Sequence, residues 1–393
     1  MSRHRSVPPG ALTALPADIS IFTPTTAEPA VRAAVNGPLW RSARAAARAP
    51  EGEGPYGPPR PVGDEGVALP EGFSVEMVAR SGYKSAGVVW HSAPQAGACF
   101  PDGHGWIYVS NSETPLLGGV SAIRFGADGV PRGAYRILSG TNLNGVGCAT
   151  PWNTWLSAEA IPGGRVFECD PYGVAAAMPR LSMGCLHHAG MACAPDRRVV
   201  YLVEDEPDGC LYRFIPDDWG DLTSGTLQVL VADPGDRSPV IWRRVPNPAA
   251  QVEPARRQVP GARRFDRPAG LHYADGVCRF VTADGRMWSY DTMRHTIAAT
   301  PDASSLLPAL PPTRSGEVFA PGHGMTIDVL TPEGEAWPFL RITGHDASAI
   351  TGAAFSPDGR HLYFSSRLGA TGALSGTGGV TYAVTGPFRH LDA

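Results

Sequence analysis

A short phrase recurs along most of this chain: a turn built on Pro-Asp or Asp-Gly, followed by a run of β-branched and aromatic residues. It occurs at 100–110, 194–203, 273–282 and 356–365, and further strand-like runs follow at 209–214 and 285–291. Asp-Gly turns favour tight β-hairpins, and no helical periodicity separates these runs. An approximate repeat of strand, turn and strand is typical of the blades of a β-propeller.

The length sets the number of blades. With 47 glycines and 39 prolines spread along 393 residues, the composition favours many turns and few long helices. Blades of about 40–55 residues divide the last roughly 320 residues into six. We therefore predict an all-β fold, a six-bladed β-propeller over residues 66–393. A β-sandwich whose turns resemble one another by accident is the alternative.

The first 65 residues differ from the rest. They are rich in Ala, Pro and Arg, and allow short helices at 28–35 and 40–49. A turn-rich stretch at 52–61 separates them from the repeats. We predict that residues 1–65 form an N-terminal arm, extended or helical.

The charge and the cysteine content limit the classes of binding partner and the cellular location to be expected for this protein. The formal net charge is −4, from 33 basic and 37 acidic residues that are mixed along the sequence. This pattern predicts no binding to nucleic acid or to a membrane, and leaves a small molecule as the expected substrate. The seven cysteines form no CxxC pair, and no apolar leader is found near the start. Reduced thiols and a cytoplasmic location are therefore expected, and the sequence does not address the oligomeric state.

Several segments resemble the PhoX-type alkaline phosphatases, a family of six-bladed propellers. The most specific one runs from Gly147 to Ala160 and reads Gly-Cys-Ala-Thr-Pro-Trp-Asn-Thr-Trp-Leu-Ser-Ala-Glu-Ala. The family has a cysteine here, then Pro-Trp-Gly-Thr-Trp, then two adjacent glutamates. Further similar segments follow in the family's order at 166–171, 187–189, 200–209, 267–270 and 351–359.

The resemblance implies hydrolysis of phosphomonoesters at a cluster of iron and calcium ions, which carboxylates hold on the propeller axis. Hard cations prefer oxygen ligands, and closely spaced cations need many negative charges around them. This sequence departs from the family at four acidic positions, which are Ala160, His188, Ala269 and Ala349. So few carboxylates would leave the repulsion between several multivalent ions uncompensated. We therefore expect the metal cluster to be dismantled and no cofactor to be bound, with one divalent ion (calcium, iron or zinc) as the alternative.

Three residues are the predicted catalytic groups: Glu159, Glu204 and His188. By the resemblance, the two glutamates face the central channel, where a buried carboxyl group has a raised pKa and can act as an acid or a base. Consecutive strand residues face opposite ways, so only one of His187 and His188 lines the channel, and His188 takes a former glutamate position. Each of these residues also has a purely structural interpretation, as a carboxylate bound to backbone amides or a histidine with satisfied hydrogen bonds.

A second set of residues is predicted to contact the substrate. By the resemblance, Glu113 and Asn111 belong to the family's Asn-His-Glu motif, and Asp205 follows Glu204 in an acidic pair. A buried inert thiol is the alternative for Cys148, and a structural role is the alternative for Trp152. The complete set is Asn111, Glu113, Cys148, Trp152, His187, Asp205 and Arg267.

Three functions remain open at this point. The first is an enzyme whose axial pocket, enlarged by the three alanines, performs acid–base chemistry such as cyclisation, isomerisation or hydrolysis on a small organic substrate in specialised metabolism. The second is a metal-dependent phosphoesterase with a reduced metal site. The third is a propeller that binds or organises partners without catalysis.

Overall fold

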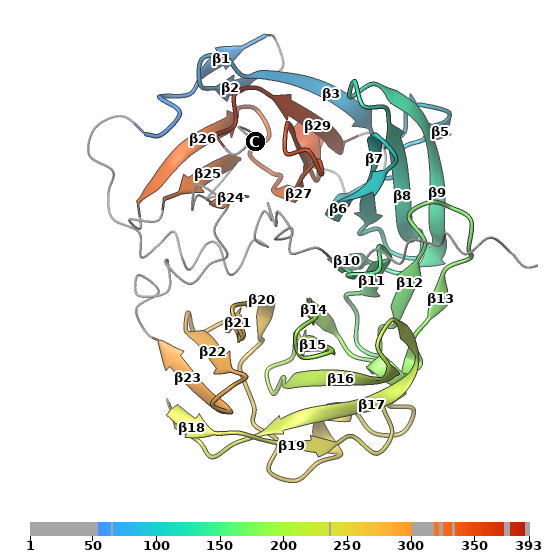
Figure 1. The fold of residues 1–393 in the computed structure, drawn as a ribbon, viewed down its shortest axis with the longest axis vertical. Helices are drawn as coiled ribbons and strands as arrows, with labels where there is room; N and C mark the ends of the chain where they lie inside the picture. Colours follow the sequence, from blue (N-terminus) through green and yellow to red (C-terminus); the bar gives the residue numbers. More distant parts are fainter. Residues whose placement is uncertain are drawn as a thin grey trace, which may run out of the picture.

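The computed structural model describes residues 54–63, 66–235, 237–300, 318–321, 325–331, 335–372 and 378–389. Within them, six antiparallel sheets of four or five strands surround a common centre (Figure 1). This confirms the all-β propeller and its six blades. The helices expected at 28–35 and 40–49 lie outside the described residues.

Blades 1 to 3 follow one another along the chain. Blade 1 contains β6 (Pro94–Asp102), β7 (Gly105–Ser112), β8 (Gly118–Phe125) and β9 (Pro131–Thr141). Blade 2 contains β10 (Asn144–Ala149), β11 (Trp155–Glu159), β12 (Val166–Cys169) and β13 (Met178–Pro179). Blade 3 contains β14 (His188–Ala194), β15 (Val199–Glu204), β16 (Leu211–Asp218), β17 (Asp221–Val231) and β19 (Ile241–Arg244).

Blades 4 to 6 complete the ring. Blade 4 contains β20 (Ala269–Ala274), β21 (Val277–Val281), β22 (Met287–Asp291), β23 (Thr296–Thr300) and β18 (Arg237–Pro239). Blade 5 contains β24 (Val318–Pro321), β25 (Thr326–Leu330), β26 (Ala336–Ile342), β2 (Val67–Leu69) and β1 (Arg60–Val62). Blade 6 contains β27 (Ile350–Phe355), β28 (His361–Ser366), β29 (Val380–Thr385) and β3 (Ser74–Arg80).

Among the described residues, three short helical turns and one small hairpin lie outside the blades. The turns are η1 (Leu181–Met183), η2 (Ala255–Arg257) and η4 (Gly369–Thr371), and the hairpin pairs β4 (Lys84–Ser85) with β5 (Val88–Val89). No helix in the described part of the chain is long and apolar enough to cross a membrane.

The ring is closed by strands from both ends of the described chain. β3, near its start, pairs with β29, near its end, in antiparallel register from Arg80 opposite Val380 to Ser74 opposite Thr385. β1 and β2 add to blade 5 in the same way, through the pairing of β2 with β26. β1 lies within residues 1–65, which the sequence assigns to the arm. The assignment of residues 66–393 to one domain stays a prediction.

The recurring turn phrase has one structural role. In four blades it connects the innermost strand to the second strand, as between β6 and β7, β14 and β15, β20 and β21, and β27 and β28. The apolar runs that follow these turns are buried in clusters between neighbouring blades, such as the cluster of blades 2 and 3 around Leu156, Val200 and Tyr212. The hydrophobic core is therefore divided among the spaces between blades. Polar groups can then lie at the ends of the inner strands, next to the channel.

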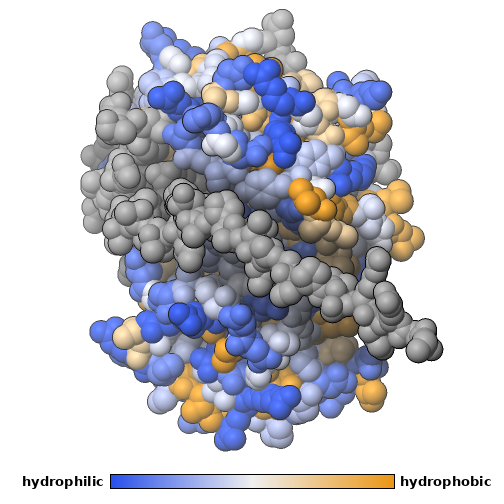
Figure 2. All heavy atoms as spheres, turned by 45° about the vertical axis from the view of Figure 1, so that its right-hand side comes forward, coloured by the Kyte–Doolittle hydropathy of each residue, from blue (hydrophilic) through white to orange (hydrophobic). Residues whose placement is uncertain are grey.

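On the face shown in Figure 2, apolar residues form small groups among hydrophilic ones over the described surface.

Candidate functional site

The predicted site residues gather at one end of the channel because each blade repeats the same hairpin. In blades 2 and 3, Glu159 and Glu204 end the second strand, opposite the first residues of the innermost strands, Asn144 and His188. In blades 1 and 6, Glu113 and Arg367 directly follow the second strands β7 and β28. The propeller repeat alone therefore brings side chains from four blades to the same end of the ring.

The innermost strands are irregular at this end. In five blades the register shifts within the first few residues of β6, β10, β14, β20 and β27. Gly352 has a φ of +61°, and a side chain there would collide with the Gln95 carbonyl of the neighbouring blade. Such bulges re-aim side chains next to functional sites.

Glu204 is the most perturbed of the predicted carboxyl groups. It is 1% exposed, accepts a hydrogen bond from the Tyr212 hydroxyl at 2.5 Å, and lies 3.4 Å from a guanidinium nitrogen of Arg256. Burial raises the pKa of Glu204 to about 7, although Tyr212 and Arg256 act in the opposite direction. This carboxyl group is therefore close to half-protonated at neutral pH.

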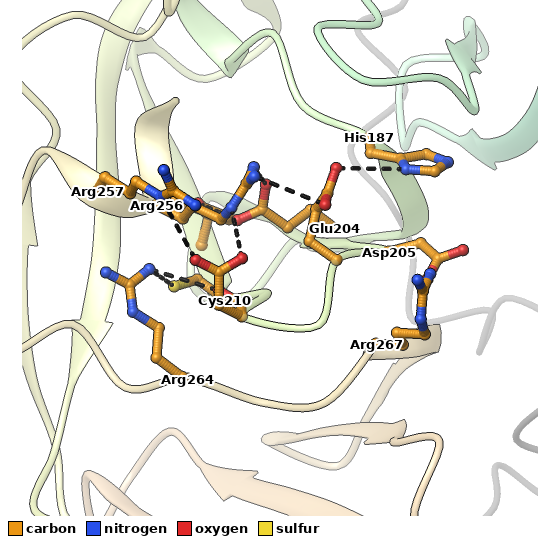
Figure 3. A network of polar contacts seen from close by, with 11 residues as sticks. His187, Glu204, Asp205, Cys210, Arg256, Arg257, Arg264 and Arg267 are labelled. Atoms are coloured by element: carbon orange, nitrogen blue, oxygen red, sulfur yellow. Dashed lines mark hydrogen bonds and ion pairs between the residues drawn. The ribbon is translucent and has the colours of Figure 1, made fainter. Parts of the chain in front are cut away.

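Arg256 organises the acidic turn that follows β15. Its guanidinium group contacts Asp208 at 2.8 Å and Glu206 at 3.6 Å in addition to Glu204 (Figure 3). The side chain of Arg256 is mostly buried, so these contacts lie in a poorly solvated environment where charge interactions are strong. Three carboxylates within five residues are thus held by one cation from η2.

The two neighbouring histidines have different surroundings. His188 is 1% exposed, and neither of its ring nitrogens has a hydrogen-bond partner in the described structure. Burial lowers the pKa of His188 to about 4, so its imidazole is neutral at physiological pH. His187 is partly exposed, and its Nδ1 atom lies 3.6 Å from Glu206. The structure therefore places the predicted catalytic His188 in the interior and leaves His187 as the more accessible of the two.

Each of the other predicted carboxylates lies beside its own arginine. Glu159 is 3% exposed, and its Oε2 atom accepts hydrogen bonds from the Arg165 backbone N–H at 3.0 Å and from Arg165 Nε at 3.1 Å. Its Oε1 atom accepts a further bond from the Asn142 backbone. The more exposed Asp205 pairs with Arg267 at 3.0 Å, as Figure 3 shows to the right of Arg256.

Glu113 completes this pattern in blade 1. Its Oε2 atom lies 2.6 Å from Arg367 of blade 6 and accepts a hydrogen bond from Gln95 at 2.8 Å. Ala160 lies near Glu113, since a side chain added at Gly145 would touch both of them. The backbone carbonyl of Ala349 accepts a hydrogen bond from the Arg367 N–H at 3.0 Å. Two of the positions where the family has a glutamate therefore lie beside the Glu113–Arg367 pair.

Asn111 and Trp152 make contacts that support the fold. Asn111 is fully buried; its Oδ1 atom accepts hydrogen bonds from Trp155 and Ser157, and its amide donates to the Val146 carbonyl. The indole N–H of Trp152 donates to Glu168 at 2.9 Å. Both side chains therefore have partners that explain their presence without a substrate, and their predicted binding role stays a prediction.

Cys148 lies farther along β10, away from the carboxyl groups. Its Sγ atom is 3.7 Å from Sγ of Cys193 in β14. This sulfur pair was not anticipated from the sequence, because the two cysteines are 45 positions apart and belong to different blades.

Sequence reasoning predicted Arg267 but missed the other three arginines and two of the acids. Arg165 follows Glu159 by six residues, and a short turn brings it back. Arg256 and Arg367 come from remote segments, and no local pattern marks them. Glu206 and Asp208 could have been found, because they continue the acidic run that starts at Glu204.

A surface pocket of about 630 Å³ lies elsewhere, between the ends of β17 and β18 and the turn at Gly261. Its lining includes Arg264, whose guanidinium group also donates to the Cys210 sulfur, but none of the predicted site residues. The organic-sized hollow expected on the axis stays a prediction.

Comparison with known proteins identifies the relationship. Residues 162–272 match the family model of alkaline phosphatase PhoX. No curated protein matches the sequence. The fold is similar to that of Pseudomonas fluorescens PhoX in complex with vanadate, a transition-state analogue, with a TM-score of 0.63, 16% identity, and coverage of 82% of this chain and 96% of the other. A gluconolactonase from Xanthomonas campestris has a TM-score of 0.41, 14% identity, and coverage of 85% and 98%. The chain is therefore a divergent PhoX-like β-propeller.

Proposed function

We propose that this protein is an enzyme that performs acid–base chemistry on a small organic substrate at the end of the channel where Glu204 lies. One observation carries the proposal. Each of the four carboxylates that the family resemblance places there is accompanied by an arginine, in the pairs Glu113–Arg367, Glu159–Arg165, Glu204–Arg256 and Asp205–Arg267.

These pairs argue against the iron and calcium cluster that the resemblance implies. These four pairs contribute no net negative charge, and Glu206 and Asp208, which share Arg256 with Glu204, add at most two negative charges against the charge of several multivalent cations. Both oxygens of Glu159 are already engaged by hydrogen bonds. The described residues therefore do not fit the cluster.

Glu204 and His188 are the groups that we assign to proton transfer. They are directly opposite each other in the β14–β15 register, so their side chains leave the sheet on the same face. Their environments push their pKa values apart, to about 7 for Glu204 and about 4 for His188. A protonated carboxyl group beside a neutral imidazole provides one proton donor and one acceptor.

The remaining residues have supporting roles in this proposal. Arg256 holds the Glu204 carboxyl group in place, and Glu159 contributes negative charge near His188. We expect the more exposed His187, Asp205 and Arg267 to contact the substrate on its way to Glu204. A substrate that gains a proton from Glu204 and loses one to His188 is isomerised, cyclised or prepared for hydrolysis. Specialised metabolism and a cytoplasmic location remain part of this proposal.

Activity profiling tests the proposal without knowledge of the substrate. Purified protein, dialysed against a chelator, would be incubated with a metabolite extract, and mass spectrometry would record the compounds consumed and formed. We expect a conversion by the wild type that Glu204→Gln abolishes and that Glu71→Gln, at an exposed turn, retains. No conversion by the wild type would favour a binding or scaffold propeller.

The similarity to PhoX supports a second candidate, a phosphoesterase with a reduced metal site. It predicts hydrolysis of p-nitrophenyl phosphate that depends on added calcium, iron or zinc and is lost on chelation. Such hydrolysis, together with no chelator-resistant conversion, would overturn the acid–base proposal.

A further inference from the structure

Two cysteines from neighbouring blades lie in contact beside the channel. Cys148 is in β10 and Cys193 is in β14, and these innermost strands of blades 2 and 3 lie side by side (Figure 1). Their sulfur atoms are 3.7 Å apart, and both residues are half-buried. In the described structure, all seven cysteines are free thiols.

We propose that Cys148 and Cys193 form a reversible disulfide that links blade 2 to blade 3. The sulfur atoms must approach from 3.7 Å to about 2.05 Å, which small side-chain rotations can achieve when both thiols already face each other. Neither strand has to leave its sheet.

The two thiols are differentiated in a way that suits this reaction. Contact with the Cys193 thiol lowers the pKa of Cys148 despite its burial, and the same contact, together with burial, raises the pKa of Cys193. The thiol that loses its proton first is the nucleophile, and we assign Cys148 to that role. Cys193 is the resolving thiol.

Hydrogen peroxide is the oxidant in this reaction. The Cys148 thiolate attacks one peroxide oxygen, the O–O bond breaks, and a sulfenic acid forms with release of hydroxide. Cys193 then attacks the Cys148 sulfur, the S–S bond forms, and the S–O bond breaks. Together the two thiols lose two electrons and two protons, and one peroxide becomes two molecules of water.

The position of the cysteine pair predicts how a disulfide would affect the channel end that carries Glu159 and Glu204. In β10, Cys148 lies four residues from Asn144, the partner of Glu159; in β14, Cys193 lies five residues from His188. At about 3.3 Å per residue, the sulfurs lie on the order of 15 Å along the strands from that site. The disulfide therefore stiffens the ring without touching Glu204.

Thiol counting and peptide mapping test the proposal. After limited peroxide treatment of the whole protein, we expect the wild type to lose two titratable thiols, to yield one peptide pair linked through Cys148 and Cys193, and to recover both thiols with dithiothreitol. The variants Cys148→Ser and Cys193→Ser should form no such link. Cys185→Ser, which removes another half-exposed cysteine of this region, should behave as the wild type.

Stability provides a second readout. The link would close a loop of 45 residues, and the oxidised wild type should melt about 5 °C higher than the reduced form. The proposal is overturned if Cys148 is oxidised to a sulfinic acid while Cys193 stays free, or if the link forms between other cysteines. It is also overturned if peroxide leaves both thiols intact while Cys185 reacts.

Discussion

The pH dependence of stability should reveal the state of Glu204. This carboxyl group has a pKa of about 7 in the folded chain, against 4.5 for a free glutamate side chain. Between these two values the folded chain keeps a proton that the unfolded chain releases, so unfolding becomes progressively easier as the pH rises. Above about pH 7 both states are ionised, and the loss is complete.

The size of the effect follows from the shift. At about 1.4 kcal/mol per pKa unit, Glu204 should remove about 3 kcal/mol of folding stability between pH 4.5 and pH 8. The glutamine in Glu204→Gln cannot ionise, so the variant should not lose stability in this way as the pH rises. Its contact with Tyr212 can change the stability only by an amount that is the same at every pH. For a chain of this length, 3 kcal/mol corresponds to a difference of about 4 °C in melting temperature.

The assay is a set of thermal melts of wild type and Glu204→Gln at intervals from pH 4.5 to pH 8. Glu71→Gln, a change at an exposed turn, is the matched control and should follow the wild type. The difference between Glu204→Gln and the wild type should grow in favour of the variant as the pH rises. Two parallel curves over the whole range would refute the raised pKa and remove the physical basis for proton transfer by Glu204.

Three further changes have defined outcomes. Arg256→Met leaves the buried Glu204 carboxylate without its cation. Urea denaturation should show a loss of about 2–4 kcal/mol in the free energy of unfolding at pH 8, and a smaller loss at pH 5, where Glu204 is protonated. Asn111→Ala removes the acceptor of the Trp155 indole and the donor to the Val146 carbonyl, and should cost about 2–4 kcal/mol in the same assay; a loss near zero would mean that water replaces the amide. Dialysis against a chelator should leave the melting temperature unchanged, because the arginine-paired carboxylates at the channel end leave too little negative charge for a metal cluster; a drop of several degrees would instead show a structural metal ion.

The propeller could be predicted from the sequence because its signal is local and repeated. The Pro-Asp or Asp-Gly phrase predicts a tight hairpin, and each of its four copies, at 100–110, 194–203, 273–282 and 356–365, connects the first two strands of a blade. The strands that close the ring carry no such mark. β1 and β3 have no distinctive sequence pattern, and their positions in the ring are set only by pairing with β2 and β29.

The candidate site was predictable only in part. The positions of Glu159 and Glu204 follow from motifs that resemble a known family, and both do end the second strands of their blades. Their arginine partners could not be predicted from these motifs, because a turn returns Arg165 to Glu159 and Arg256 comes from a remote segment. Arg256 enters from η2 after an interval of 52 residues, and no sequence pattern connects it to Glu204.

Closure of the ring by β3 has a consequence for biosynthesis. This strand leaves the ribosome early, while its partner β29 is made roughly 300 residues later. At about 5–20 residues per second, the edge of β3 waits on the order of 15–60 s before its hydrogen bonds can form. During that interval the nascent chain presents an unpaired strand to other polypeptides, so the yield of this protein in cells should depend on chaperone supply more than on the stability of the finished ring.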